Sequence, residues 1–258
     1  MIAKIRVLII DDDEDDYLIT SHYLEDITDF QVEHSWCYRS DEALALLKKN
    51  EYDAYFIDYR LGIQTGLEIM HEAINDGCDK PIILLTGKGN NHIDKMAVEY
   101  GAYDYLIKSD LSAEKLERTL RYAIERYRSF KIIKDNEKKY KLLFENATSS
   151  IFISDNLLHF VEGNRVALSL FKCSAQELVG KSLFNYIKDP KDPLLKKMIS
   201  NKITIDNYLI EVVTATNEKI IGNLSLHYFE LDNDKRYWQG IILNETNKPL
   251  IGKTGLQV

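Results

Sequence analysis

Residues 4–13 read KIRVLIIDDD, in which the unbroken apolar run Val7–Ile10 is followed directly by three aspartates. An unbroken apolar run of this length is typical of a strand that is covered on both faces, as in a parallel sheet. The run is far too short to span a membrane, and the acids directly after it do not fit a secretory signal. The stretch therefore predicts a buried strand with carboxylates at its C-terminal end.

The following hundred residues continue to alternate between strand and helix patterns. Short apolar runs predict four more strands, at residues 31–36, 54–57, 81–85 and 104–107. Helical spacing of apolar residues predicts helices at 14–27, 41–49, 67–74, 93–100 and from 114 onward. Five strands that alternate with five helices predict a doubly wound parallel sheet with right-handed crossovers.

Reactive side chains follow the predicted strands at their C-terminal ends, where such sheets carry their functional groups. These residues are Asp11, Asp12, Asp13, Asp58, Thr86 and Lys108. Clustered carboxylates repel one another unless a cation joins them, and Mg²⁺ prefers oxygen ligands. A carboxylate can attack a phosphoryl group, while a hydroxyl and an ammonium stabilise the transferring oxygens. The set therefore suits the acceptance of a phosphoryl group on an aspartate.

Each of these residues also has a purely structural interpretation. An aspartate after a strand commonly forms a turn or caps a helix, and acids at a helix start favour its dipole. A single threonine is commonly a cap, and a single lysine is commonly solvated. The prediction of a site rests on matching chemistry at four strand ends.

Four segments resemble the receiver domain of two-component response regulators, over about residues 1–128. They are VLIIDDDEDD (7–16), FIDYRLGIQTG (56–66), IILLTGKG (82–89) and YDYLIKSD (103–110). The resemblance implies a flavodoxin-like fold, with Asp58 as the phospho-acceptor. It implies a Mg²⁺ (or Mn²⁺) ion held by Asp12, by Asp11 mostly through water, by Asp58 and by the backbone carbonyl of Arg60. Thr86 and Lys108 would hold the phosphoryl oxygens, and Tyr105 would turn inward on activation as the switch partner of Thr86.

Two features depart from the usual family pattern. Ser109 follows the lysine where the family usually has proline. Arg60 and Lys88 are both basic and occupy positions that tune the lifetime of the acyl phosphate in the family. We expect these two side chains to shield the phosphoryl group and to alter its hydrolysis.

Residues 113–144 predict one long helix that connects two halves of the chain. Apolar residues recur at helical spacing at Leu116, Leu120, Ala123, Tyr127 and Phe130. The charged stretch that follows, KIIKDNEKKYK (131–141), contains no Gly or Pro. A helix of this length could form a parallel coiled-coil dimer. The alternative is a solvated spacer whose apolar residues pack on their own domains.

The second half predicts an antiparallel sheet with a few helices. Strands are expected at 150–154, 159–162, 204–214, 219–230 and 236–244, with helices at 166–170, 175–178 and 193–199. Residues 137–247 resemble a PAS domain through EKKYKLLFENATSSIFISD (137–155), NRVALSLFKCSAQELVGKSL (164–183) and the three closing strands. Residues 248–258 are expected to form a tail.

We expect no cofactor in the PAS half. The flavin-binding subclass needs a cysteine in the segment LFNYIKD (183–189), which has none, and Cys173 lies too early. His159 and His227 fall on strands and fit surface or satisfied core histidines better than haem ligands. A role in dimerisation or signal relay is therefore expected for this half.

Composition narrows the class of function further. The 258 residues carry a net charge of −8, which divides into −11 for residues 1–128 and +3 for the remainder. The acidic half would repel nucleic acid, and no segment suggests a membrane partner. Three cysteines without metal-ligand spacing fit a reducing cytoplasm.

Together these features predict a cytoplasmic response regulator. A histidine kinase or phosphotransfer protein would be its partner, the chain would form a homodimer, and it would have no enzymatic activity beyond its own phosphorylation and slow dephosphorylation. The alternatives are the N-terminal receiver–PAS portion of a hybrid sensor histidine kinase and a scaffold that is not phosphorylated.

Overall fold

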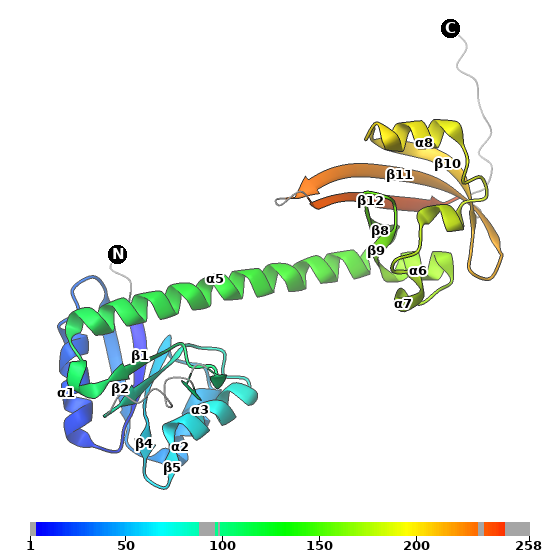
Figure 1. Cartoon of the computed structure of the whole chain (residues 1–258). Coiled ribbons are helices and arrows are strands. Elements are labelled where there is room, and N and C mark those ends of the chain that lie inside the picture. Colours follow the sequence, from blue (N-terminus) through cyan, green and yellow to red (C-terminus); the bar gives the residue numbers. More distant parts are fainter. Residues whose placement is uncertain (1–3, 88–95, 98, 232–234, 246–258) are drawn as a thin grey trace. The chain divides into compact units, whose positions relative to one another are not determined.

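The computed structural model describes residues 4–87, 96–97, 99–231 and 235–245. The chain divides into two compact units, Met1–Asp135 and Asn136–Val258. The division falls inside the longest helix, α5 (Ala113–Asn146), which therefore contributes to both units (Figure 1). This helix confirms the predicted connector between two folds. The expected tail at 248–258 lies outside the described residues.

The first unit contains the predicted five-stranded parallel sheet, with strand order β2-β1-β3-β6-β7. Its strands are β1 (Lys4–Ile10), β2 (Gln31–Cys37), β3 (Ala54–Asp58), β6 (Ile82–Thr86) and β7 (Asp104–Ile107). The other helices of this unit with described bounds are α1 (Glu14–Glu25), α2 (Ser40–Lys48), α3 (Gly66–Asn75) and the short η1 (Lys108–Asp110). Half of the predicted helix at 93–100 (residues 93–95 and 98) lies outside the described residues, and residues 96, 97 and 99 are helical. Two short strands, β4 (Arg60–Leu61) and β5 (Gln64–Thr65), were not expected.

Both faces of this sheet are covered, because successive side chains of a strand point to opposite sides. Along β1, Val7 and Ile9 pack with Leu24 of α1 and with Leu116 of α5. Leu8 and Ile10 of the same strand pack on the other face, together with residues of α2 and α3 such as Leu47 and Met70. The double coverage explains why the strands are continuous apolar runs in the sequence.

The second unit is built on a five-stranded antiparallel sheet, with strand order β10-β11-β12-β8-β9. The strands are β8 (Ser150–Asp155), β9 (Phe160–Gly163), β10 (Ile205–Val213), β11 (Lys219–Leu231) and β12 (Lys235–Asn244). The helices are α6 (Arg165–Phe171), α7 (Ala175–Leu178), η2 (Leu183–Tyr186) and α8 (Pro193–Ser200). This arrangement confirms the fold implied by the resemblance to PAS domains.

Aromatic side chains fill the interior of the second unit. Phe160 contacts Phe152 and Phe171 in edge-to-face geometry, with ring centroids 5.0 and 5.2 Å apart. Tyr186 packs on Phe171 at 4.9 Å. These rings belong to one continuous core cluster, so this part of the interior is occupied by side chains.

Asn164 joins the end of α5 to the sheet of the second unit. Its side chain is fully buried, and its Nδ2 donates hydrogen bonds to the carbonyl oxygens of Phe144 (3.0 Å) and Ser149 (2.9 Å). Its Oδ1 accepts from the amides of Ile151 (3.1 Å) and Ala167 (2.9 Å). One side chain thus caps α6, binds the backbone at the start of β8 and binds the last turn of α5.

Candidate functional site

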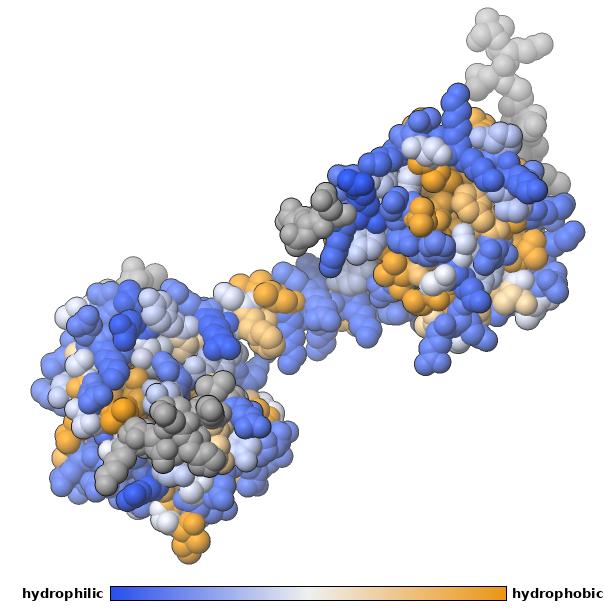
Figure 2. All heavy atoms as spheres, in the orientation of Figure 1, coloured by the Kyte–Doolittle hydropathy of each residue, from blue (hydrophilic) through white to orange (hydrophobic). Residues whose placement is uncertain are grey.

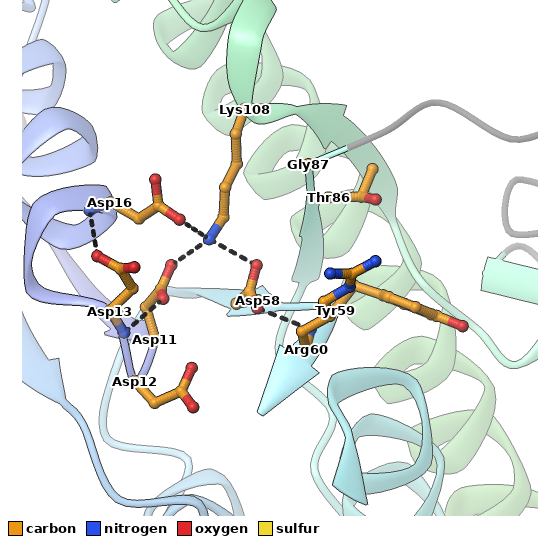
Figure 3. A pocket seen from close by; sticks show the side chains of 10 residues that line it. All are labelled: Asp11, Asp12, Asp13, Asp16, Asp58, Tyr59, Arg60, Thr86, Gly87 and Lys108. Atoms are coloured by element: carbon orange, nitrogen blue, oxygen red, sulfur yellow. Dashed lines mark hydrogen bonds and ion pairs between the residues drawn. The ribbon is translucent and has the colours of Figure 1, made fainter. Parts of the chain in front are cut away.

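A pocket of about 370 Å³ opens at the C-terminal ends of the strands of the parallel sheet (Figure 3). The strands of a parallel sheet all run in the same direction, so their C-terminal ends lie at one edge of the sheet. The ends of β1, β3 and β6 and the start of η1 meet there. The lining residues are Asp11, Asp12, Asp13, Asp16, Asp58, Tyr59, Arg60, Thr86, Gly87 and Lys108.

The ammonium group of Lys108 lies among three carboxylates. Its Nζ atom is 2.8 Å from Asp11 Oδ2, 2.6 Å from Asp58 Oδ1 and 2.6 Å from Asp16 Oδ2. The lysine reaches the pocket from η1, directly after β7, and its side chain is 13% exposed. Figure 3 shows the three contacts converging on one nitrogen atom.

Three carboxylates could hold a divalent cation. One oxygen each from Asp11, Asp12 and Asp58 lies within 4.8 Å of the others. Asp11 and Asp58 are buried, whereas Asp12 is exposed. The donors are hard anionic oxygens next to an open pocket, which suits Mg²⁺ with several retained waters. The residues therefore fit the predicted ion.

Backbone amides fix the direction of each carboxylate. Asp58 Oδ2 accepts from the Arg60 amide at 2.7 Å, and Asp12 Oδ2 accepts from the Gly62 amide at 3.2 Å. Asp11 Oδ1 accepts from the Asp13 amide at 3.1 Å. These bonds arise because the chain turns immediately after β1 and after β3, which leaves backbone N–H groups facing the strand ends.

Burial shifts the protonation equilibria in the pocket. Removal from water raises the pKa of Asp11 to about 6, although Lys108 opposes that shift. Burial likewise raises the pKa of Asp58, again against the effect of Lys108. Burial alone would lower the pKa of Lys108, but its hydrogen bonds to the three carboxylates together raise it above the usual range. The lysine is therefore cationic at neutral pH.

Most of the predicted site residues meet in this pocket. Asp11, Asp12, Asp58, Arg60, Thr86 and Lys108 all line it. Tyr105 is not among the lining residues; it lies on β7, half-buried against the core, and borders a separate hollow beside α5. Lys88 lies outside the described residues.

Asp16 is a pocket residue that the sequence analysis did not single out. Asp13 caps α1 by accepting from the amides of Asp15 (2.9 Å) and Asp16 (3.3 Å). The cap places Asp16 in the first helical turn, where its side chain reaches Lys108. An aspartate at position 13 suits a helix N-cap, and that assignment would have placed Asp16 in the first turn of the helix beside the strand ends.

The side chains considered as cofactor ligands in the second unit have other partners. His159 Nδ1 is 3.1 Å from Asp155 Oδ2, and His227 Nε2 is 3.5 Å from Asp206 Oδ1. Cys173 is partly buried and packs against the core of the unit. Both histidines are more than 40% exposed, as expected for surface residues.

Comparison with known proteins identifies relatives of the first unit. Residues 7–121 match the family model of the response regulator receiver domain. The regulatory protein VanR of Enterococcus faecium is 32% identical over 136 residues, which are 52% of this chain and 55% of VanR. The probable C4-dicarboxylate response regulator DctR of Priestia megaterium is 28% identical over 126 residues, 49% of this chain and 53% of DctR. The chain thus spans about half the length of these relatives.

Solved structures similar to each unit are also found. A response regulator receiver domain protein from Clostridium thermocellum aligns with a TM-score of 0.44 and 25% identity, covering 49% of this chain and 98% of that protein. The PAS domain of an HTR-like protein from Haloarcula marismortui aligns with a TM-score of 0.40 and 17% identity, covering 45% of this chain and 98% of that domain.

None of the helices in the described part of the chain is both long enough and apolar enough to cross a membrane.

Proposed function

We propose that this chain, whose residues 7–121 match the family model of the response regulator receiver domain, accepts a phosphoryl group on Asp58 in two-component regulation. The donor would be a phosphohistidine of a histidine kinase or of a phosphotransfer protein. The observation that carries the proposal is the position of Asp58: buried at the end of β3, 2.6 Å from the Lys108 ammonium and grouped with Asp11 and Asp12.

The geometry supports a direct displacement at phosphorus. A carboxylate oxygen of Asp58 would form the new O–P bond while the P–N bond to the donor imidazole breaks and the imidazole leaves with the electron pair. Mg²⁺ held by Asp11, Asp12, Asp58 and the Arg60 carbonyl would neutralise charge on the phosphoryl oxygens. Lys108 would pair with one of these oxygens, and the Thr86 hydroxyl would donate to another.

We expect no turnover of an external substrate. The proposed reaction loads one phosphoryl group on each chain, and hydrolysis of the acyl phosphate returns the chain to its starting state. Arg60 lines the pocket beside Asp58, consistent with a role in shielding the acyl phosphate from water. The corresponding role for Lys88 stays a prediction.

Phosphorylation would be relayed along α5 to the PAS unit. In the first unit, Asp79 binds α5 through Lys131 Nζ at 2.7 Å and the Tyr127 hydroxyl at 3.3 Å. In the second unit, the Asn164 amide holds the carbonyl of Phe144 near the other end of the helix. A change at either attachment would act on the same helix, as coupling between the two units requires.

We further propose that α5 mediates a homodimer. Apolar side chains remain exposed along it, including Phe130 (61%) and Ile133 (65%), and Figure 2 shows hydrophobic surface on this helix. Exposed apolar residues at coiled-coil spacing favour a second helix as partner. Light scattering should show a dimer for the full chain. Ile133→Lys should weaken it, and Leu157→Lys, an equally exposed position in the second unit, should not.

The test of the phospho-acceptor uses the full chain, Mg²⁺ and acetyl phosphate. Intact-mass spectrometry should show the gain of one phosphoryl group, which EDTA and Asp58→Asn abolish. Asp29→Asn, an exposed aspartate of the same unit, is the matched control and should leave the gain intact. Unchanged mass in the wild-type chain would reject the proposal and favour the scaffold alternative.

A further inference from the structure

Lys108 has a third anionic partner that the proposed transfer reaction does not use. Asp16 Oδ2 lies 2.6 Å from Lys108 Nζ, as close as Asp58 Oδ1. Asp16 comes from α1, whereas Asp11 and Asp58 come from strand ends. The contact joins residues 92 positions apart in the chain.

The three contacts match the donor capacity of the lysine. An ammonium group carries three N–H donors, and each of the three carboxylates can accept one of them. An incoming phosphoryl oxygen can therefore gain Lys108 only if one carboxylate gives up its bond.

Exposure identifies the carboxylate that can be released most readily. The side chain of Asp16 is 36% exposed, compared with 0% for Asp11 and 7% for Asp58. Water can replace the lysine at Asp16, whereas a buried carboxylate left without a partner loses far more free energy. Asp58 keeps its negative charge until the O–P bond forms, so before transfer Asp16 is the partner that an incoming phosphoryl oxygen would displace.

We propose that Asp16 is a positioning residue that retains Lys108 in the unphosphorylated pocket and competes with the phosphoryl oxygens for its ammonium. The inference rests on the proposed phospho-acceptor function of Asp58. Lys108 would turn from Asp16 to the phosphoryl group on transfer and return to Asp16 after hydrolysis. The pair would thus restrain phosphorylation in the resting state.

Replacement of Asp16 tests this competition. The second-order rate constant for phosphorylation by acetyl phosphate is measured at saturating Mg²⁺ for the full-length wild type, Asp16→Asn and Asp15→Asn. Asp15 lies in the same helical turn, so Asp15→Asn removes the same charge at nearly the same place without removing a partner of Lys108. We expect Asp16→Asn to exceed Asp15→Asn by about threefold or more, the range for a partly exposed ion pair. Asp16→Glu, which retains the carboxylate, should return the rate toward that of the wild type.

A second measurement detects the ion pair without phosphorylation. In the metal-free protein, the ¹⁵Nζ resonance of Lys108 should shift in Asp16→Asn and stay in place in Asp15→Asn. Two outcomes would overturn the inference and leave the phospho-acceptor proposal standing: equal phosphorylation rates for the two asparagine variants, or a Lys108 ¹⁵Nζ resonance that does not shift in Asp16→Asn. A wild-type chain that gains no phosphoryl group would overturn both.

Discussion

A β-carbon on Gly66 would lie 2.0 Å from the main-chain oxygen of Asp58 and 2.8 Å from Cγ2 of Ile57. The start of α3 therefore packs directly against the end of β3, and only a residue without a side chain fits there. The Gly66 amide also donates to the Tyr59 carbonyl at 2.9 Å, which closes the loop that begins at Asp58. The position of the proposed phospho-acceptor thus depends on a glycine eight residues later.

Gly66→Ala should destabilise the first unit by about 2–3 kcal/mol, because the overlap is with backbone and with a packed core side chain. Peptide-resolved hydrogen exchange should show the loss in β3. Gly87→Ala is the control for stability, since a β-carbon there meets nothing within 4 Å. Equal protection of β3 in the two variants would contradict the packing argument.

Lys108→Met should have opposite effects on stability and on metal affinity. Loss of the ammonium leaves buried Asp11 and Asp58 without a cation, so in EDTA at neutral pH the first unit should lose about 3 kcal/mol. Mg²⁺ should restore the loss, and its affinity should increase several-fold because no cation competes for the carboxylates. Calorimetric titration and urea unfolding with and without Mg²⁺ measure both effects.

Lys48→Met is the comparison for that experiment. Lys48 pairs with Asp76 at a surface position where both side chains are more than 40% exposed, so its removal should change stability little. Weaker Mg²⁺ binding in Lys108→Met than in the wild type would show that the lysine supports the metal site rather than competing with it.

The affinity for Mg²⁺ should fall as the pH drops through about 6. Burial raises the pKa of Asp11 from 3.8 to about 6, and a protonated carboxyl group is a poor ligand. The folded, metal-free state holds this proton more tightly than the unfolded state does. The stabilisation that comes from binding this proton at Asp11 is therefore fully present below about pH 4 and is lost as the pH rises through about 6.

Trp36 offers a probe for this titration. Its Nε1 donates a 2.8 Å hydrogen bond to the main-chain oxygen of Asp11, so its fluorescence should respond to changes at the site. Mg²⁺ titrations between about pH 5 and about pH 8 should show affinity rising and then levelling. Asp11→Asn should flatten the dependence; a wild-type affinity independent of pH would refute the assignment.

Asn164→Ala should destabilise the second unit by about 3 kcal/mol and loosen the end of α5. Four hydrogen bonds end on this buried amide, and its removal leaves buried backbone groups without partners. Hydrogen exchange should increase at residues 140–146 and in β8. Asn156→Ala, at an exposed position in the same unit, should leave both segments protected. Unchanged exchange in α5 would mean that Asn164 does not hold the helix.

The element pattern of this protein could be predicted because its causes are local. The strands Lys4–Ile10 and Ala54–Asp58 contain the apolar runs 7–10 and 54–57, which form strands because both of their faces are covered. The long helix α5 contains no Gly or Pro over its 34 residues and has a buried apolar face in its first turns. The two-residue strands β4 and β5 were missed, because so short a pairing has no periodic signal.

The members of the candidate site could be predicted in part for a topological reason. Residues at the C-terminal ends of parallel strands must lie at one edge of the sheet, so Asp11, Asp58, Thr86 and Lys108 could be grouped from the sequence alone. The position of the Tyr105 side chain does not follow from the topology in this way, because Tyr105 lies within β7 and the direction of its side chain depends on the packing around that strand.

Periodicity and residue type along the chain were enough to predict the two fold classes, the connecting helix and the acidic strand ends. Three contacts depend instead on how the units pack: Lys108 with Asp16, Gly66 with Asp58, and Asn164 with Phe144. The raised pKa of Asp11 also depends on packing, because burial in the folded unit removes water from its carboxylate. These features join residues distant in sequence, and their distances and burial are set by the packing of the whole unit.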